Sequence, residues 1–301
     1  MPAIDLFQWR ERAPLPWPRS FYAAGILDGK FVVAGGTYWQ DDRKIWCDRV
    51  DAFDPLANRW ESAAAMPRPQ GEGACVICGG ALYVLGGGAD GSVEAAVWAF
   101  QRGAWSILPR MTLPEPRRLV AGAVVDGTLY ILGGLARTEF ASAQPTVWAA
   151  KPDGPWENRA SLPGPVRFNS AVAVVGGRIL MAGGATPEKG GIRNLDDVIA
   201  YDPRADEWST VGRLPSACRG QCGLEEGSRL LIIGGYSDNF ESRILGLDLQ
   251  TGQVSTVGGL PHGLCETIFL RWGDRIIGVS GENAPYLRAP WTLEAKLERF
   301  V

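Results

Sequence analysis

Histidine is nearly absent from this chain, since His262 is its only one among 301 residues. One imidazole cannot form a metal centre that needs several, and a Ser-His-Asp triad would depend wholly on this residue. The net charge of −3 gives no basic surface for nucleic acid or an anionic membrane. No apolar run approaches the roughly 20 residues of a membrane-spanning helix. No segment keeps a 3.6-residue period, so the sequence predicts an all-β fold without a helix to open a phosphate loop.

Cysteines are also few for a chain of this length, which argues against a disulfide scaffold. There are six, at Cys47, Cys75, Cys78, Cys218, Cys222 and Cys265. Cys75 and Cys78 fall on an expected strand, where residues three apart point to opposite faces. We expect these thiols to be small buried hydrophobes in a reducing compartment, and the sequence implies neither a metal nor a cofactor.

The first residues, MPAIDLFQWRERAP, lack a basic stretch followed by an apolar one, so no signal peptide is visible. For the sequence as it stands we expect a cytoplasmic location. A periplasmic location would follow if a leader has been removed.

What the chain does contain is a repeat of about 50 residues. Five apolar segments end in a glycine pair: Phe31–Gly36, Leu82–Gly87, Leu129–Gly134, Ile179–Gly184 and Leu230–Gly235. In a sixth copy, Ile276–Gly281, the first glycine is replaced by Ser280. A tryptophan recurs at a nearly fixed distance before each pair, at Trp9, Trp60, Trp105, Trp156 and Trp208, with Val254 in the last position.

Each unit reads as four short strands, and six such units predict one six-bladed β-propeller, because radial repetition hides sheet edges. The expected blades span about 17–61, 67–107, 116–158, 166–210, 217–256 and 262–298. The last unit supplies only three strands, and Trp9 is left over at the other end. We therefore predict that an N-terminal strand, about 4–10, completes the C-terminal blade and closes the ring.

The glycine pair, the strand that follows, the Asp-Pro turn and the spaced tryptophan together resemble the kelch repeat, over essentially the whole chain. The resemblance implies a structural role for the paired glycines and for tryptophans packed between blades. Because strands alternate in direction, the loops after each glycine pair and those before each first strand share one face. Those loops vary in length, as expected of a binding face.

Cations recur just before the first strand of most units, and first strands line a propeller's axis. They are Arg19, Arg68, Arg117 with Arg118, Arg167 and Arg219, with His262 in the sixth unit. One hypothesis is that they converge on the channel mouth and hold a carboxylate ligand. The alternative is that each arginine closes its own blade through carbonyls or acids.

Aromatic residues outside the tryptophan repeat fall on the same predicted face. They are Trp17, Tyr38, Trp39, Tyr236 and Tyr286. Such rings stack on sugars and also bind partner proteins, while packing at the rim explains them equally well.

The irregular sixth unit, from Gly281 to Arg288, reads GENAPYLR and resembles a segment of the sialic acid mutarotases (N-acetylneuraminate epimerases), which are six-bladed kelch propellers. The resemblance implies that Glu282 is the catalytic acid/base and Arg288 its partner. The alternative is an ion pair that only braces a loop.

Two functions remain open from the sequence. The first is a cofactor-free mutarotase or epimerase of a sialic-acid-like acidic sugar, with Glu282 and Arg288 at its centre. The second is a non-catalytic kelch module that binds a protein or glycan through the same face. Neither involves nucleic acid or a membrane.

Overall fold

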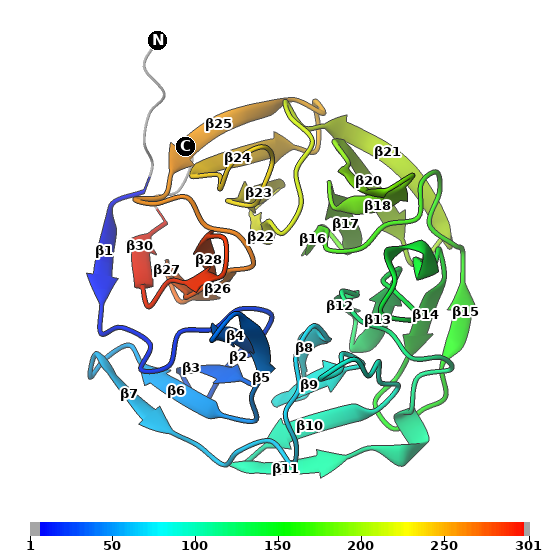
Figure 1. The fold of residues 1–301 in the computed structure, drawn as a ribbon. Helices are drawn as coiled ribbons and strands as arrows, with labels where there is room; N and C mark the ends of the chain where they lie inside the picture. Colours follow the sequence, from blue (N-terminus) through cyan, green and yellow to red (C-terminus); the bar gives the residue numbers. More distant parts are fainter. Residues whose placement is uncertain (1–6, 298–301) are drawn as a thin grey trace.

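The computed structural model describes residues 7–297. Figure 1 shows six four-stranded antiparallel sheets arranged as blades around a central axis, which confirms the predicted six-bladed β-propeller. The first strand of each blade lies next to the axis and the fourth lies on the outer wall. Two short 3₁₀ helices, η1 (Pro109–Met111) and η2 (Phe140–Ser142), are the only helical segments within 7–297, and none there could cross a membrane.

The strands of each blade follow one another in the chain, except in the last blade. Blade 1 contains β2 (Ala23–Leu27), β3 (Lys30–Ala34), β6 (Val50–Asp54) and β7 (Arg59–Ser62). Blade 2 contains β8 (Ala74–Cys78), β9 (Ala81–Leu85), β10 (Val97–Gln101) and β11 (Ala104–Ile107). Blade 3 contains β12 (Ala121–Val125), β13 (Thr128–Leu132), β14 (Val147–Ala150) and β15 (Glu157–Arg159). Blade 4 contains β16 (Ala171–Val175), β17 (Arg178–Ala182), β20 (Asp197–Asp202) and β21 (Glu207–Arg213). Blade 5 contains β22 (Cys222–Glu226), β23 (Arg229–Ile233), β24 (Arg243–Asp248) and β25 (Val254–Gly259). Blade 6 contains β26 (Ile268–Trp272), β27 (Arg275–Val279), β30 (Thr292–Lys296) and β1 (Trp9–Arg12).

The ring closes as predicted, by an N-terminal strand that joins the C-terminal blade. β1 pairs antiparallel with β30, with Trp9 opposite Ala295 and Arg12 opposite Thr292. The strand begins at Trp9 and ends two residues beyond the predicted limit. Residues 4–6 of the predicted strand and residue 298 of the predicted blade lie outside the described residues.

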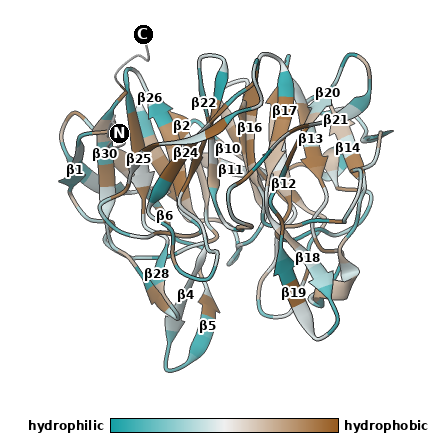
Figure 2. Ribbon diagram, turned by 90° about the horizontal axis from the view of Figure 1, so that it is seen from above, coloured by the Kyte–Doolittle hydropathy of each residue, from teal (hydrophilic) through white to brown (hydrophobic). Residues whose placement is uncertain are grey.

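Three hairpins lie between the second and third strands of their blades, in the half of the repeat whose length varies. They are β4 (Thr37–Gln40) with β5 (Arg43–Trp46), β18 (Ala185–Glu188) with β19 (Gly191–Asn194), and β28 (Glu282–Ala284) with β29 (Leu287–Arg288). Figure 2 shows all three projecting from the same face of the propeller. Insertions in the repeat therefore build walls at one end of the channel.

The repeated tryptophans link each blade to the one before it. Each indole N–H donates to a backbone carbonyl at 2.7–2.9 Å: Trp9 to Gly259, Trp60 to Ala13, Trp105 to Ala64, Trp156 to Met111 and Trp208 to Ala160. The rings also pack on neighbouring aromatics, as Trp208 does on Tyr201 with ring centres 5.1 Å apart. The tryptophan repeat is therefore a repeated contact between blades.

We expect Trp208→Phe to lower the free energy of unfolding by about 1 kcal/mol, because it keeps an aromatic ring and loses one hydrogen bond. Trp208→Ala also loses the packing of a half-buried ring, and we expect a cost of about 3 kcal/mol. Urea unfolding measures both values. Leu56→Ser, at a side chain that is 85% exposed, is the control and should change stability little. Wild-type stability for Trp208→Ala would contradict the assigned role.

Candidate functional site

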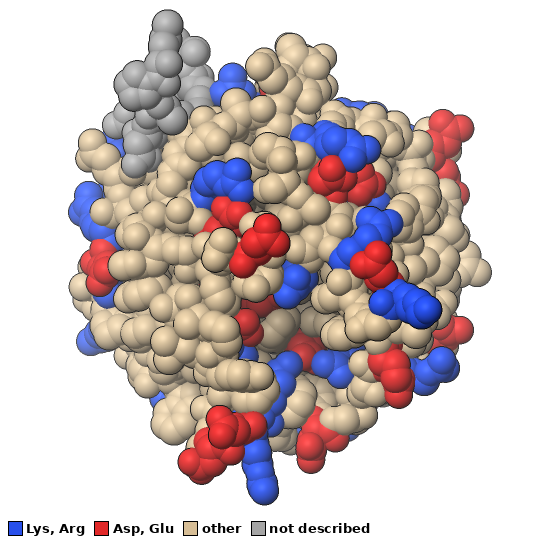
Figure 3. Space-filling model, turned by 45° about the horizontal axis from the view of Figure 1, so that its top comes forward, with Lys and Arg blue, Asp and Glu red and all other residues tan. Residues whose placement is uncertain are grey.

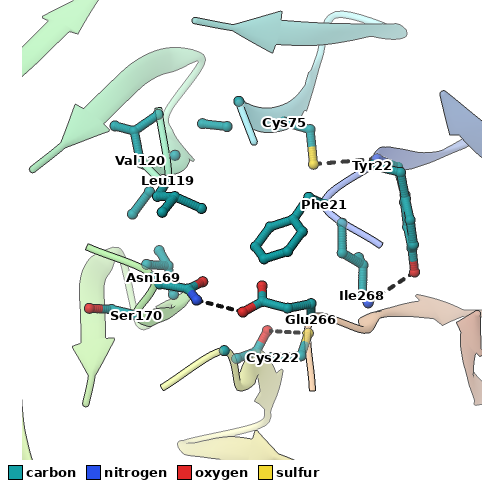
Figure 4. Close-up of a pocket in the computed structure, with 18 of the residues that line it drawn as sticks. Phe21, Tyr22, Cys75, Leu119, Val120, Asn169, Ser170, Cys222, Glu266 and Ile268 are labelled. Carbon is teal, nitrogen blue, oxygen red and sulfur yellow. Dashed lines mark hydrogen bonds between the residues drawn. The ribbon is translucent and has the colours of Figure 1, made fainter. Parts of the chain in front are cut away.

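A ring of six residues narrows the central channel, and we call it the channel ring. Its members each precede a first strand and have positive φ angles of 48–65°: Phe21, Glu72, Leu119, Asn169, Gly220 and Glu266. Backbone N–H groups link successive members, from Glu72 to Phe21 and onward to Glu266, at 2.7–3.1 Å. Figure 4 shows the side chains of Phe21, Leu119, Asn169 and Glu266 around a common space. The identity of these six side chains therefore decides what the channel can hold.

Two cavities meet at the channel ring. The channel pocket, of about 400 Å³, runs between the first strands of the blades. The mouth pocket, of about 440 Å³, lies on the side of the hairpins. Both are lined by Phe21, Glu72, Leu119, Asn169 and Glu266. Figure 3 shows charged side chains of both signs around a hollow on this face.

Aromatic and apolar side chains form opposite walls of the mouth pocket. On one side Trp39 from β4 meets Tyr286 edge-on, with ring centres 4.4 Å apart. On the other side Phe140 of η2 stacks on Phe168, with ring centres 5.5 Å apart. One apolar wall is thus built by hairpins and the other by η2 with Phe168, and polar side chains lie between them. This arrangement suits a small ligand with both apolar and polar surface.

Glu282 and Arg288 lie together on the wall of the mouth pocket. Arg288 Nη1 is 3.0 Å from Glu282 Oε1, and its Nε donates to the carbonyl of Thr37 at 3.3 Å. The Arg288 side chain is 4% exposed and that of Glu282 is 22% exposed. Burial lowers the pKa of Arg288, while the Glu282 carboxylate acts in the opposite direction. The Glu282 carboxylate is therefore accessible from the pocket, whereas the guanidinium of Arg288 is almost fully buried.

Glu72 and Glu266 place two further carboxyl groups in the mouth pocket, in different surroundings. Glu72 forms ion pairs with both Lys44 and Arg118. Glu266 forms no ion pair within residues 7–297, and it accepts hydrogen bonds from Asn169 Nδ2 and from the Cys265 thiol. Its deep position in the channel raises the pKa of Glu266 to about 7, and nearby Glu282 adds to this effect. Glu72 therefore has two cationic partners, whereas Glu266 is favoured as the neutral acid.

Three of the predicted arginines are fully buried within blades and do not reach the pocket. Arg19 pairs with Asp51 at 2.9 Å and donates to the carbonyl of Gly35. Arg167 pairs with Asp197 at 2.6 Å. Arg117 donates to Thr146 and lies 4.5 Å from the centre of the Trp148 ring. The expectation that these arginines converge on the mouth does not hold, because each closes its own blade.

The other predicted residues divide between the pocket and its surroundings. Arg219, Trp39 and Tyr236 line the mouth pocket, and the guanidinium of Arg219 lies 4.6 Å from the centre of the Tyr236 ring. Arg68, Tyr38 and His262 do not line it. Arg68 pairs with Glu94 at 2.9 Å, Tyr38 meets the edge of Trp17, and His262 stacks on Trp291.

The register of the repeat explains which arginines reach the pocket. Isolated antiparallel bridges pair Arg118 with Leu135, Arg219 with Tyr236, and Cys265 with Glu282. Arg19, Arg117 and Arg167 each stand one residue before the bridge, so their side chains turn into the blade. Grouping the arginines by residue type does not reveal this difference. It also does not identify Lys44, Glu72, Asn169 and Glu266 as residues of the pocket. In all six units the bridged residue lies at the same distance before the glycine pair or its Ser280-Gly281 counterpart. This constant spacing would have located the channel ring from the sequence.

Within residues 7–297, no group of three or more His, Cys, Asp and Glu side chains is arranged to hold a metal ion. The six cysteines are free thiols, three of them buried and three half-buried.

The comparisons with known proteins agree with this architecture. Residues 18–67 and 166–215 each match the kelch motif, which makes the protein a kelch-type β-propeller. Among curated proteins, spermatocyte protein spe-26 of Caenorhabditis elegans is 30% identical over 63% of this chain and 34% of its own length. Human kelch-like protein 34 is 28% identical over 85% of this chain and 42% of its own. Kelch-like protein terF of Aspergillus terreus is 27% identical over 75% of this chain and 52% of its own.

The chain thus spans about a third to a half of the length of these relatives. Among solved structures, that of YjhT superposes with a TM-score of 0.79 at 16% identity and covers 93% of this chain and 95% of its own. At that identity the likeness shows the fold alone.

The surroundings of Glu266 predict a pH-dependent contribution to stability. The folded protein binds the proton of the Glu266 carboxyl group more tightly than the unfolded chain does, because the pKa of this group is raised in the folded state. The stabilisation from this protonated group is therefore complete below the ordinary glutamate pKa and is lost as the pH rises to about 7. Glu266→Gln stays neutral throughout. We expect it to be more stable than the wild type by about 1–3 kcal/mol at pH 8 and equally stable near pH 4.

Urea unfolding of both proteins at the two pH values tests this expectation. The effects of the other titrating groups are common to both proteins, so they cancel in the difference between the two free energies of unfolding. Glu188→Gln, at an exposed residue of a hairpin, is the matched control and should follow the wild type. A Glu266→Gln protein that is less stable than the wild type at pH 8 would contradict the assigned surroundings.

Proposed function

We propose that the protein is a cofactor-free mutarotase or epimerase of a small acidic sugar of the sialic acid type, with the mouth pocket as its active site. The observation that carries this proposal is the Glu282–Arg288 pair, whose carboxylate faces the pocket while its guanidinium is almost fully buried. The resemblance of residues 281–288 to a segment of the sialic acid mutarotases supports the same assignment.

The reaction needs only proton transfers. A base takes the proton of the anomeric hydroxyl, the bond from the anomeric carbon to the ring oxygen breaks, and the ring oxygen receives a proton. The open sugar then closes on the other face of its carbonyl by the reverse steps. Glu282 is placed to accept the first proton, and its ion pair with Arg288 holds the carboxylate in position. Such a base contributes on the order of 10²–10⁴-fold to a rate.

Cations and aromatic rings of the pocket suit the rest of such a substrate. Arg219 donates to Asn194 through Nη1, and within residues 7–297 its Nη2 donates to no protein group. A planar guanidinium suits a carboxylate, and we assign the substrate carboxylate to Arg219. Trp39 and Tyr286 line the same pocket and present aromatic rings of the kind on which sugars stack.

Proton NMR of freshly dissolved crystalline N-acetylneuraminate tests the proposal. We expect the protein to speed the approach to anomeric equilibrium, and Glu282→Gln to lower the catalysed rate by about 10²-fold or more. Arg288→Lys, which keeps the charge and loses the planar geometry, should give an intermediate rate.

Glu188→Gln lies on the same face outside the pocket and serves as the control, with an expected wild-type rate. An equilibration rate that the wild-type protein leaves unchanged would overturn the proposal for this sugar. A Glu282→Gln protein that keeps the full rate and unfolds at a lower temperature would assign the ion pair a bracing role only.

A second function is favoured by a different observation. Large apolar side chains at the hairpin tips are exposed, with Tyr286 65% and Leu287 53% accessible. Matched proteins include kelch-like protein 34 and kelch-like protein terF, and a non-catalytic module would bind a protein or glycan through these tips. An inactive wild-type protein whose capture of a glycan is abolished by Tyr286→Ala would favour this function.

A further inference from the structure

We propose that Glu266 is a second catalytic residue of the mouth pocket and acts as the general acid opposite Glu282. This inference rests on the proposed function, because it assigns a second group to the same reaction. Mutarotation moves two protons, one away from the anomeric hydroxyl and one to the ring oxygen. A pocket with one ionised and one protonated carboxyl group can move both protons within one encounter.

Backbone pairing holds the segments that carry the two carboxyl groups side by side, and the charge of Glu282 acts on Glu266. The N–H of Cys265 donates to the carbonyl of Glu282 at 2.8 Å, and the N–H of Glu282 donates to the carbonyl of Cys265 at 2.7 Å. Glu266 is the next residue in the chain, so it and Glu282 stand on adjoining backbone segments of blade 6. Both side chains line the mouth pocket, Glu282 on its wall and Glu266 on its floor at the channel ring.

The partners of these two side chains differ in the way that acid and base require. Glu282 forms an ion pair with the Arg288 guanidinium, 3.0 Å away. Glu266 has an amide and a thiol as hydrogen-bond donors and lies deep in the channel, where charge is costly. Among the other charged groups, Arg219 favours ionisation of Glu266 and Glu282 opposes it. The guanidinium of Arg288 also interacts with the Glu266 carboxyl group. The resulting pKa of about 7 for Glu266 is suited to proton exchange near neutral pH.

Neither of the remaining acidic groups of the pocket can take this role. Glu72 is held by Lys44 and Arg118 at once, so both of its carboxylate oxygens are occupied by ion pairs. The Cys265 thiol is buried, and burial raises its pKa well above the ordinary value. Glu266 is therefore the pocket carboxyl group that can donate a proton.

The assignment balances over the reaction. Glu266 donates its proton to the ring oxygen while Glu282 takes the proton of the anomeric hydroxyl, and the bond between the anomeric carbon and the ring oxygen breaks. In the open form Glu282 is protonated and Glu266 is ionised. Closure on the other carbonyl face returns both protons, so the enzyme ends as it began and no oxidant, reductant or cofactor takes part.

The test is the pH profile of catalysed N-acetylneuraminate equilibration, followed by proton NMR with the uncatalysed rate subtracted at each pH. For the wild type we expect activity to fall as the pH rises through about 7, where Glu266 loses its proton. Glu266→Gln should lower the rate by about 10²-fold and abolish this falling limb. Asn169→Ala removes a hydrogen bond that favours ionisation, so the falling limb should move to higher pH.

Thermal unfolding at each pH identifies a variant that fails to fold. If Glu266→Gln fails to fold, the shift of the falling limb in Asn169→Ala is the decisive result, because that variant keeps Glu266.

The outcomes separate the two proposals. A wild-type protein without catalysis overturns the proposed function and this inference together. An active wild type that loses activity in Glu282→Gln, but keeps its rate and falling limb in Glu266→Gln, overturns only the role of Glu266. An unchanged profile in Asn169→Ala counts against it in the same way.

Discussion

A close backbone contact between blades recurs at the first glycine of each pair, and the packing of the ring requires it. A Cβ at Gly35, Gly86, Gly133, Gly183 or Gly234 would lie within 2.3–2.6 Å of a backbone carbonyl of the following blade. The second glycine of each pair donates its N–H to that same carbonyl, at 2.6–3.1 Å. No side chain fits into this contact, and the positive φ angles of these glycines add a second reason for the residue type. Blade spacing, channel width and the position of the hairpins all follow from it.

The junction between blades 6 and 1 is built differently, and the Glu282–Arg288 pair is located there. Ser280 replaces the first glycine, and its hydroxyl accepts from the N–H of Arg19 at 3.0 Å and donates to the carbonyl of Ala289 at 2.7 Å. The Ser280 side chain thus links two backbone segments that are in direct contact at the other blade junctions. Glu282 follows two residues later and lies 3.4 Å from the Ser20 hydroxyl of blade 1.

The repeat predicted the number of blades and the closure by β1, because each feature was sampled several times along one chain. The site was predicted less well, since its residues differ from blade to blade. Arg19, Arg117 and Arg167 were grouped with Arg219 by residue type, although a shift of one position turns a side chain from the pocket into the blade. The bond between Asn169 and Glu266 joins residues of different blades, and no local pattern contains that information.

The charges of the mouth pocket connect proton binding with ligand binding. Its cations are Lys44, Arg118, Arg219 and Arg288, and its carboxyl groups are Glu72, Glu266 and Glu282. Lys44 and Arg118 both pair with Glu72, and Arg288 pairs with Glu282. With Glu266 neutral the four cations therefore face two carboxylates, and this positive excess attracts an anionic ligand. Ionisation of Glu266 reduces the excess from two charges to one. Because such coupling is reciprocal, a bound carboxylate must in turn hold the proton on Glu266 more tightly. An acidic substrate would therefore help to keep its own general acid protonated.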